Sequence, residues 1–157
     1  MQHLEIDFTI ILFLFFILGE DPSPEVSLED HCKFKYLFNF RGVAASFRLK
    51  HLFMCNSLVL HVGSEWLEFF YPALKPWVHY VPVESYASSE SIEDLLEFLR
   101  AHEKIAISIA QNGHLFVKDF LKMFDVEEYW AVLLTKYAQK LSFKPTVDKA
   151  LMKRITK

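Results

Sequence analysis

The hydrophobic pattern in the first half of the chain predicts short strands. Lys35–Phe40 (KYLFNF) is rich in aromatic residues and alternates in part, and Ser57–Val62 (SLVLHV) is a compact apolar run that Gly63 ends. A third strand is expected at Val78–Val83 (VHYVPV). Pro82 places that strand at an edge or makes it end early, because proline has no N–H for a sheet ladder.

Helical patterns lie between these runs. Val43–Met54 (VAASFRLKHLFM) has no helix breaker and carries apolar residues at helical spacing, so we expect one helix over the whole segment. Ser64 is a candidate N-cap for a short helix over Glu65–Tyr71, which Pro72 would stop.

The remainder of the chain predicts helices only. A first helix is expected to begin at Ser91, which with Asp94 forms a variant of the capping box. The following helices are expected at Glu103–Gln111, at His114–Met123 after a C-cap at Asn112-Gly113, and at Val126–Leu141 before Pro145.

This order of elements is β-α-β-α-β followed by several helices. Strands that alternate with helices favour an α/β fold in which a parallel sheet is covered by helices. Three strands are few for a complete doubly wound domain, so the pattern is also that of a portion of a larger fold. No internal repeat is visible.

A separate hydrophobic segment, Phe8–Leu18 (FTIILFLFFIL), precedes this body. As a helix it would rise about 16 Å, too short for a bilayer core of about 30 Å. A poor signal sequence, an exposed leader and a buried strand or helix all remain open. We therefore expect a leader and linker at 1–25, a domain at 26–143 and a basic tail at 144–157.

Composition narrows the class of protein. The 157 residues (18.5 kDa) are 52% hydrophobic and 24% charged, with 16% aromatic residues, which excludes a disordered or low-complexity chain. A net charge of −3 and a pI near 6.2 give no electrostatic footprint for nucleic acid. The histidines show no metal-binding spacing, and no P-loop, G-x-G-x-x-G or G-x-S-x-G motif occurs.

One segment carries candidate chemistry. The first predicted strand leads through Arg41-Gly42 into a predicted helix with Ala44, Ala45, Ser46 and Arg48 near its start. Small side chains there permit close approach to the backbone, a hydroxyl and a guanidinium suit phosphate, and a helix start at the carboxyl edge of a parallel sheet attracts anions. An ordinary strand-to-helix turn has the same pattern.

Cys32 and Cys55 flank this strand and helix. In a packed βα unit both thiols would lie at the same end, where a bridge would close a loop of roughly 23 residues. Two buried free thiols are equally compatible with the spacing.

The stretch Lys35–Val83 contains two long motifs, FNFRGVAASFR and EWLEFFYP followed by PWVHYVPV. Through them the chain resembles the Rumi-type protein O-glucosyltransferases, a glycosyltransferase family that also includes capsule-associated fungal enzymes. The resemblance extends from about Val26 to about Leu141, and Phe8–Leu18 lies outside it.

The resemblance implies a fold and an activity. Members are enzymes of the endoplasmic reticulum lumen with GT-B architecture, in which two Rossmann-like halves enclose a cleft. They transfer glucose from UDP-glucose, in some cases xylose from UDP-xylose, to a serine of EGF-like repeats such as those of Notch. The reaction inverts the anomeric centre, and the resemblance implies neither a metal nor another cofactor. We therefore expect the Rossmann-like C-terminal half of a GT-B enzyme, followed by several C-terminal helices and without a transmembrane span.

The resemblance also implies site residues. The family's GVAASFR segment lines the donor diphosphate, which places the UDP-sugar site at Val43, Ala44, Ala45, Ser46, Phe47 and Arg48. The Arg48 guanidinium would neutralise the departing UDP. A disulfide of the family matches Cys32 and Cys55, which favours an oxidising compartment.

The family's catalytic aspartate and acceptor groove belong to an N-terminal half that this sequence does not match, so no catalytic residue is assigned. We expect a donor-binding half that is inactive, or nearly so, on its own. A non-catalytic lumenal interaction module and an inactive fragment are the alternatives.

Overall fold

The computed structural model describes residues 4–6, 27–40, 44–63 and 65–146, in two units divided between Leu121 and Lys122. Each unit is considered by itself. The hydrophobic segment Phe8–Leu18, the position Val43 and most of the predicted basic tail lie outside the described residues.

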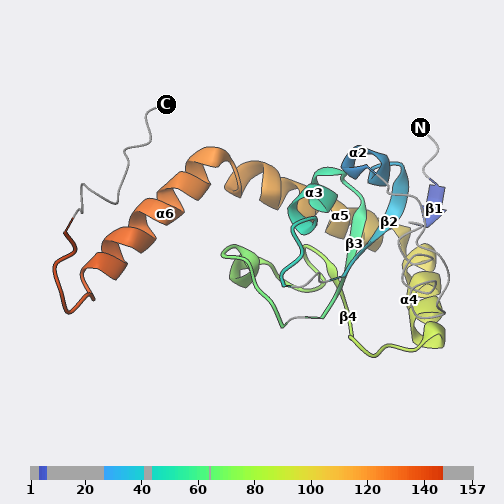
Figure 1. Ribbon diagram of the computed structural model, residues 1–157. Coiled ribbons are helices and arrows are strands. Elements are labelled where there is room, and N and C mark those ends of the chain that lie inside the picture. The colour runs from blue at the N-terminus through green and yellow to red at the C-terminus, as the bar shows by residue number, and fades with distance from the viewer. Residues whose placement is uncertain (1–3, 7–26, 41–43, 64, 147–157) are drawn as a thin grey trace. The chain divides into compact units, whose positions relative to one another are not determined.

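The N-terminal unit is built on a four-stranded parallel sheet in the order β1-β2-β3-β4 (Figure 1). The strands β2 (Phe34–Asn39) and β3 (Leu58–Val62) confirm two of the predicted runs to within one residue at each end. The strand β1 (Leu4–Ile6) was not predicted, and it pairs with β2. The fold is thus a mixed α/β arrangement with a small parallel sheet.

The third predicted strand is shorter than expected. Only Val81–Val83 forms β4, and Pro82 lies exposed within it. Trp77 has a positive φ of 61° and its N–H donates to the Tyr80 carbonyl over 2.7 Å, so a tight turn occupies the start of the predicted run. The prediction of a strand from Val78 is wrong because this turn consumes those backbone groups.

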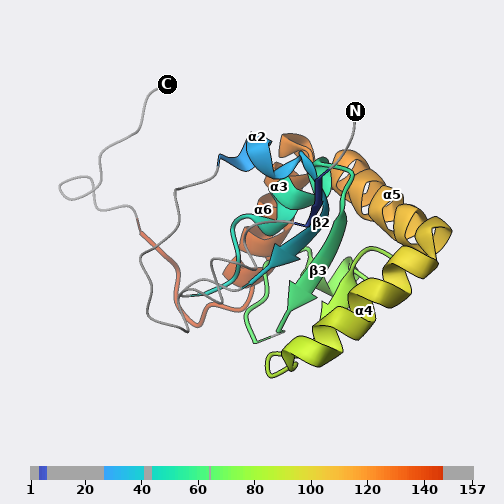
Figure 2. The same ribbon diagram turned by 90° about the vertical axis from the view of Figure 1, so that its right-hand side faces the viewer.

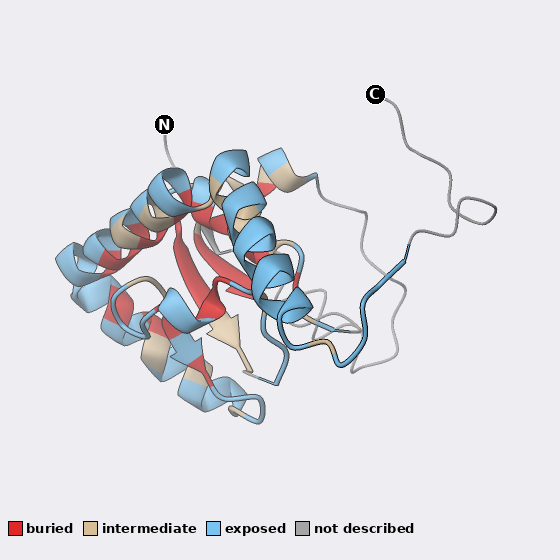
Figure 3. Cartoon of the chain, turned by 90° about the vertical axis from the view of Figure 1, so that its left-hand side faces the viewer, coloured by how far each residue is buried: buried red, intermediate tan, exposed pale blue. Residues whose placement is uncertain are grey.

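The central strands of the sheet are buried (Figure 3). Their side chains alternate between two clusters, one on each face. Tyr36, Phe38, Leu58 and Leu60 pack with residues of the helices α4 (Ser89–Ala101) and α5 (Glu103–Phe120). Residues of the opposite face pack with the helix α3 (Leu49–Met54) and with the 3₁₀ turn η1 (Tyr71–Ala73). The strands contribute Phe34, Leu37 and Val59 to this cluster. Leu49, Leu52 and Phe53 come from α3, Phe70, Tyr71 and Leu74 come from η1 and its two flanking residues, and Val117 comes from α5.

The helix α3 begins six residues later than predicted. Residues 44–48 bend before it, and the first helical residue is Leu49, whose N–H donates to the Ser46 carbonyl over 3.3 Å. Ser46 is buried and its hydroxyl donates to the Asn39 side chain, which holds this part of the segment away from helical geometry. The predicted helix from Val43 is therefore wrong in its first half.

The predicted helix at Glu65–Tyr71 is also wrong. Pro72 is the second residue of η1 and does not follow a helix as its stop signal. Proline suits that place because the first turn needs no N–H donor and the ring sets a helical φ. A short helix α2 (Leu28–His31), capped by Ser27, was not predicted.

Helix boundaries in the second half differ from the prediction in several places. The N-cap of α4 is Ser88, whose hydroxyl accepts from the Ser91 N–H over 3.2 Å, so Ser91 lies inside the helix that it was expected to begin. The two helices expected on either side of Asn112-Gly113 are one continuous helix, α5, which follows α4 with a break at His102 (Figure 2).

Gly113 is a point of close packing and not a helix end. A Cβ atom at this position would lie 2.5 Å from the His79 backbone oxygen and 2.7 Å from the Phe53 ring. Only glycine allows α5 to lie this close to α3 and to the turn before β4. This requirement outweighs the cost of glycine within a helix.

The C-terminal unit contains the helix α6 (Met123–Ala138), close to the predicted final helix. The Asp125 carboxylate accepts from the Lys122 N–H over 2.8 Å at its start. None of its residues is buried.

Cys32 and Cys55 form a disulfide with their Cα atoms 4.7 Å apart. It joins the residue after α2 to the residue after α3, and the adjacent Ser57 hydroxyl donates to the Phe34 carbonyl over 2.7 Å. The amino ends of β2 and β3 are thus held by a covalent bond and by a buried hydrogen bond.

We predict that Gly113→Ala lowers the free energy of unfolding by about 1–3 kcal/mol, because the added methyl group meets a backbone atom that has no room to move. Urea denaturation followed by circular dichroism measures this. Ser108→Ala, on an exposed position of the same helix, is the control and should change stability by less than about 0.5 kcal/mol. Equal stability of the Gly113→Ala protein would refute the close approach.

We predict that replacing both Cys32 and Cys55 by alanine lowers the free energy of unfolding by about 3 kcal/mol, since the bridge spans 23 positions and restricts the unfolded chain. Reduction of the unmodified protein by dithiothreitol should give a similar loss. An unchanged urea midpoint after reduction would contradict a stabilising role of the bridge.

Candidate functional site

The carboxyl edge of the parallel sheet brings together polar residues from neighbouring strands. Asn39 ends β2 and stands beside His61 of β3 in the strand register. Gly63, with φ of +78°, follows β3, and its N–H donates to the Val83 carbonyl of β4 over 3.2 Å. Ligands of open α/β sheets bind at this edge, so it is the first place to look for a site.

The segment 44–48 that was predicted to hold the donor lies at this edge, because Ser46 is hydrogen-bonded to Asn39. Ala44 is exposed, Ala45 is half-buried, and Ser46 is buried. Phe47 is 64% exposed and Arg48 is half-buried at the start of α3. The structure therefore brings the predicted residues together in one loop, apart from Val43, which lies outside the described residues.

The loop is tied to the sheet by side-chain hydrogen bonds. The Ser46 hydroxyl donates to Asn39 Oδ1 over 2.6 Å, and Asn39 Nδ2 lies 2.8 Å from His61 Nδ1. Asn39 is fully buried, so both ends of its amide are matched by polar partners. Neither Asn39 nor His61 was predicted as a site residue from the sequence. The available signal was a polar residue near the end of each otherwise apolar strand.

Aromatic rings enclose His61. Tyr71 and Tyr80 meet its ring edge to face, with centroids 5.7 and 5.5 Å away. Burial lowers the pKa of His61, because the cation loses its hydration. His61 is therefore neutral at pH 7, and it has an acceptor nitrogen for the Asn39 amide.

Tyr71 has an unusual hydroxyl. The oxygen is buried and has no hydrogen-bond partner among the described residues. Burial, aided by the charge of Glu68, raises the pKa of Tyr71 to about 12. The phenol is thus held neutral at any physiological pH.

Lys50 and Phe47 form a second cluster beside the loop. The Lys50 ammonium lies 4.2 Å from the centroid of the Phe47 ring and 3.4 Å from Glu68 Oε2. The centroid of the His51 ring lies 5.1 Å from the centroid of the Phe47 ring. Arg48 forms no ion pair with any residue in the part of the chain that the structure describes, so its guanidinium is the available cation of this loop.

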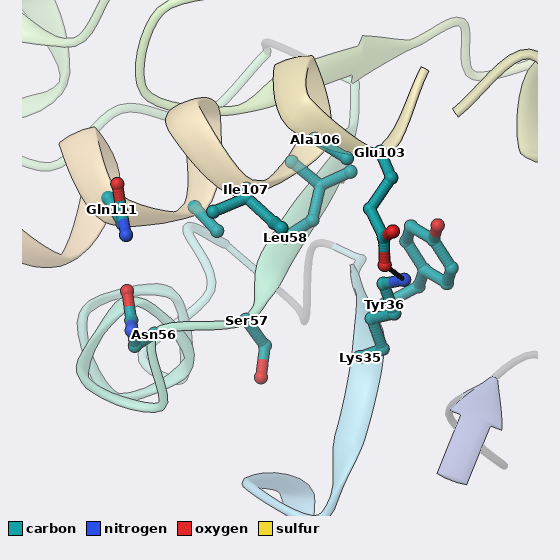
Figure 4. Close-up of a pocket in the computed structure, with 10 residues that line it drawn as sticks. Lys35, Tyr36, Asn56, Ser57, Leu58, Glu103, Ala106, Ile107 and Gln111 are labelled. Atoms are coloured by element: carbon teal, nitrogen blue, oxygen red, sulfur yellow. Dashed lines mark hydrogen bonds and ion pairs between the residues drawn. The ribbon is translucent and has the colours of Figure 1, made fainter. Parts of the chain in front are cut away.

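Two hollows lie at opposite ends of the sheet. One, of about 620 Å³, lies at the carboxyl end of β4 and the first turn of α4, where Glu84, Ser88 and Ser91 contribute polar groups. The other, of about 440 Å³, lies near the amino ends of β2 and β3 against α5, with Lys35, Asn56 and Gln111 at its rim (Figure 4). The first shares an edge with Asn39 and His61, and we favour it for that reason.

The second hollow is partly closed by an ion pair. Lys35 Nζ lies 2.6 Å from Glu103 Oε1, and this hydrogen bond lowers the pKa of Glu103 (Figure 4). The floor is made of the apolar residues Leu58, Ala106 and Ile107. None of the described residues predicted for the donor lines this hollow or the one at the end of β4.

No group of histidine, cysteine, aspartate and glutamate residues suited to a metal ion occurs within residues 4–6, 27–40, 44–63 and 65–146. In the same residues no helix has both the length and the apolar character that crossing a membrane requires.

Comparison with known proteins decides the family. The model of "Glycosyl transferase family 90" matches residues 14–157, which is most of the chain. The chain belongs to glycosyl transferase family 90. Within this family-90 chain, the edge with Asn39, His61 and the loop 44–48 is the candidate functional site.

Curated relatives agree with this assignment. The chain is 56% identical to an O-glucosyltransferase rumi homolog of Aedes aegypti over 86% of its own length, and 57% identical to protein O-glucosyltransferase 1 of Bos taurus over 82%. It is 58% identical to O-glucosyltransferase rumi of Drosophila melanogaster over 81%. The resemblance to Rumi-type proteins is thereby confirmed. The matches cover 34%, 32% and 31% of these relatives, so the chain spans about a third of their length.

We predict that acid lowers the stability of this chain through His61. Its pKa is lowered in the folded state, so below the ordinary value of 6.5 the unfolded chain binds a proton that the folded chain does not. The free energy of unfolding should therefore fall as the pH falls from about 7 through 6.5, and level off below the folded pKa. Urea denaturation at several pH values measures this.

His61→Asn retains an acceptor for Asn39 and does not titrate, so it should flatten part of this pH dependence. His79 also has a pKa lowered by burial and by Lys75, and it supplies another part. If the pH profiles of the His61→Asn protein and the unmodified protein coincide, His61 is not buried as described.

Proposed function

We propose that this chain forms the donor-binding portion of a protein O-glucosyltransferase that uses UDP-glucose. Family-90 membership and relatives of 55–58% identity named protein O-glucosyltransferase or rumi support the reaction class. The parallel sheet, with polar groups collected at its carboxyl edge, suits the Rossmann-like C-terminal half of a GT-B enzyme.

The donor diphosphate is assigned to the loop from Val43 to Arg48. This assignment depends on Arg48, because Arg48 is the cation of this loop that forms no ion pair with a described carboxylate. A guanidinium offers paired N–H donors to phosphate oxygens and would stabilise the charge that develops on the departing UDP. The exposed Phe47 ring and the small side chains of Ala44 and Ala45 leave the loop accessible to a ligand. Because α3 is short, we assign the main attraction for the diphosphate to the Arg48 side chain and not to a helix dipole.

The hollow at the end of β4 provides room for the remainder of the donor. Its volume of about 620 Å³ lies within the range of small-molecule sites. Ser88, Ser91 and Glu84 offer hydroxyl and carboxylate groups of the kind that bind sugar hydroxyls. It lies on the same edge of the sheet as the proposed diphosphate loop.

The acceptor and the compartment are part of the proposal. We assign the acceptor as a serine of an EGF-like repeat, as on Notch, and the location as the lumen of the endoplasmic reticulum. The Cys32–Cys55 disulfide supports an oxidising compartment. Since the chain spans about a third of its relatives, the aspartate base and the acceptor groove are assigned to the remaining portion, and this chain alone is expected to bind donor without rapid transfer.

We predict that the oxidised chain binds UDP and UDP-glucose in calorimetric titrations without added metal, and that Arg48→Ala weakens this binding by about tenfold or more. Loss of a charge-assisted hydrogen bond has an effect of that size. Arg48→Lys keeps the charge but not the planar fork and should give an intermediate affinity.

Arg100→Ala, on the exposed surface of α4, removes the same charge elsewhere and serves as the control with unchanged affinity. A folded chain that binds neither nucleotide would refute donor binding. Binding that Arg48→Ala leaves intact would show that the diphosphate lies elsewhere.

A further inference from the structure

With Asn39 Nδ2 toward His61, the hydrogen bonds of this amide have one consistent direction. Asn39 Nδ2 can only donate, so His61 Nδ1 must accept, and the proton of the neutral ring is on Nε2. Asn39 Oδ1 then faces Ser46, whose hydroxyl donates to it over 2.6 Å. The proton of Ser46 is therefore committed to the protein interior and is not offered to a ligand at the loop.

We propose that Asn39 and His61 are positioning residues that set the direction of the Ser46 hydroxyl, and that protonation of His61 reverses this direction. The three side chains lie on three adjacent segments: Asn39 at the end of β2, His61 at the end of β3 and Ser46 in the loop 44–48.

The reversal follows from the count of protons. When Nδ1 of His61 takes a proton from solvent, both ring nitrogens become donors, and Nδ1–H can no longer face an amide NH₂. The Asn39 amide turns over, so that Oδ1 accepts from Nδ1–H and Nδ2 donates to Ser46 Oγ. Ser46 then accepts from the interior, and its own O–H is released toward the loop. One proton is taken up, and only hydrogen bonds change.

The surroundings of His61 leave this change to His61 itself. Among the described residues, the titratable groups in ring contact with His61 are Tyr71, from η1, and Tyr80, from the turn before β4. Burial raises the pKa of both phenols, so neither ionises between pH 5 and 8. The neighbour from β2 is the uncharged Asn39, and the lowered pKa of His61 arises from burial and not from a charged neighbour in the described chain.

A consequence for the donor rests on the proposed function. A hydroxyl proton released toward an anion-binding loop adds a hydrogen bond to a phosphate oxygen, and this state also places a positive charge behind the loop. Donor binding should therefore favour protonated His61, and by linkage the affinity for donor should rise on acidification.

The direct test is nuclear magnetic resonance of the labelled, oxidised chain from pH 8 to pH 5. We expect the Nε2–H tautomer of His61 at pH 8. We also expect the backbone amide signals of Ser46 and Phe47 to change with the same midpoint as the His61 ring. An Nδ1–H tautomer, or loop signals that do not follow the His61 titration, would overturn the proposal.

Matched variants separate this coupling from a general effect of acid. His61→Asn keeps an acceptor oxygen and cannot titrate, so the pH dependence of the Ser46 signal should disappear. His79→Asn is the same substitution at another histidine, whose Nδ1 accepts from the Lys75 N–H over 2.8 Å, and it should leave that dependence unchanged. Persistence of the dependence in His61→Asn overturns the proposal. If His61→Asn does not fold, Ser46→Ala removes the hydroxyl at the other end of this series of hydrogen bonds. The amide signal of residue 46 should then no longer change with the His61 titration.

Calorimetry with UDP-glucose at pH 7.5 and 5.5 tests the consequence for the donor. UDP-glucose has no terminal phosphate that titrates near pH 6, as UDP has. The affinity of the unmodified chain should rise about three- to tenfold at the lower pH, and that of His61→Asn should not. Equal pH dependence in both proteins overturns the role of His61 in binding. No binding at either pH refutes the proposed function, whereas the resonance experiment still decides the coupling.

Discussion

The parallel register of β2 and β3 is the constraint on which the rest of this structure depends. Both faces of these strands are buried, so each side chain has a prescribed cluster to enter. The same register places Asn39 beside His61 at the carboxyl edge. A slip of one residue would exchange the faces of β2 and would move a polar amide into an apolar layer. The core and the candidate site are therefore specified by one pairing.

The helix α3 shows how the site is supported from outside the sheet. Six residues are too few for a helix to be stable by itself. The helix is held at its end by the bond from Cys55 to Cys32, on its apolar face by the sheet, and on another side by α5, where Gly113 approaches Phe53. Arg48 precedes this braced helix directly, so its backbone is held by elements that take no part in chemistry.

Much of the fold could be predicted from the sequence, because the apolar runs of β2 and β3 and the long amphipathic helices have clear periodicity. The errors arose where a long-range contact outweighs a local pattern. Gly113 resembles a helix end but serves a packing contact, and Ala44 to Arg48 have helix-forming residues but are bent by the bond from Ser46 to Asn39. Pro72 lies within the 3₁₀ turn η1, where the sequence pattern indicated a helix stop.

The candidate site, too, could be predicted only where it has a local sequence signal. The loop and Arg48 stand in a distinctive motif, whereas Asn39 and His61 are single polar residues whose importance appears only when two strands are aligned. Their separation of 22 positions gives no local signal. The pairing of Cys32 with Cys55 needed the family resemblance, since the spacing alone allowed free thiols.

The disulfide has a further effect on the covalent structure of the chain. The bridge and the backbone between Cys32 and Cys55 form a closed ring, and this ring contains β2, the loop 44–48 and α3. A protease that cuts one peptide bond within the ring opens it but leaves the two pieces joined through sulfur. Only reduction would separate them. The loop that we assign to the donor can thus be cut once without dividing the polypeptide, a protection that segments outside the ring do not have.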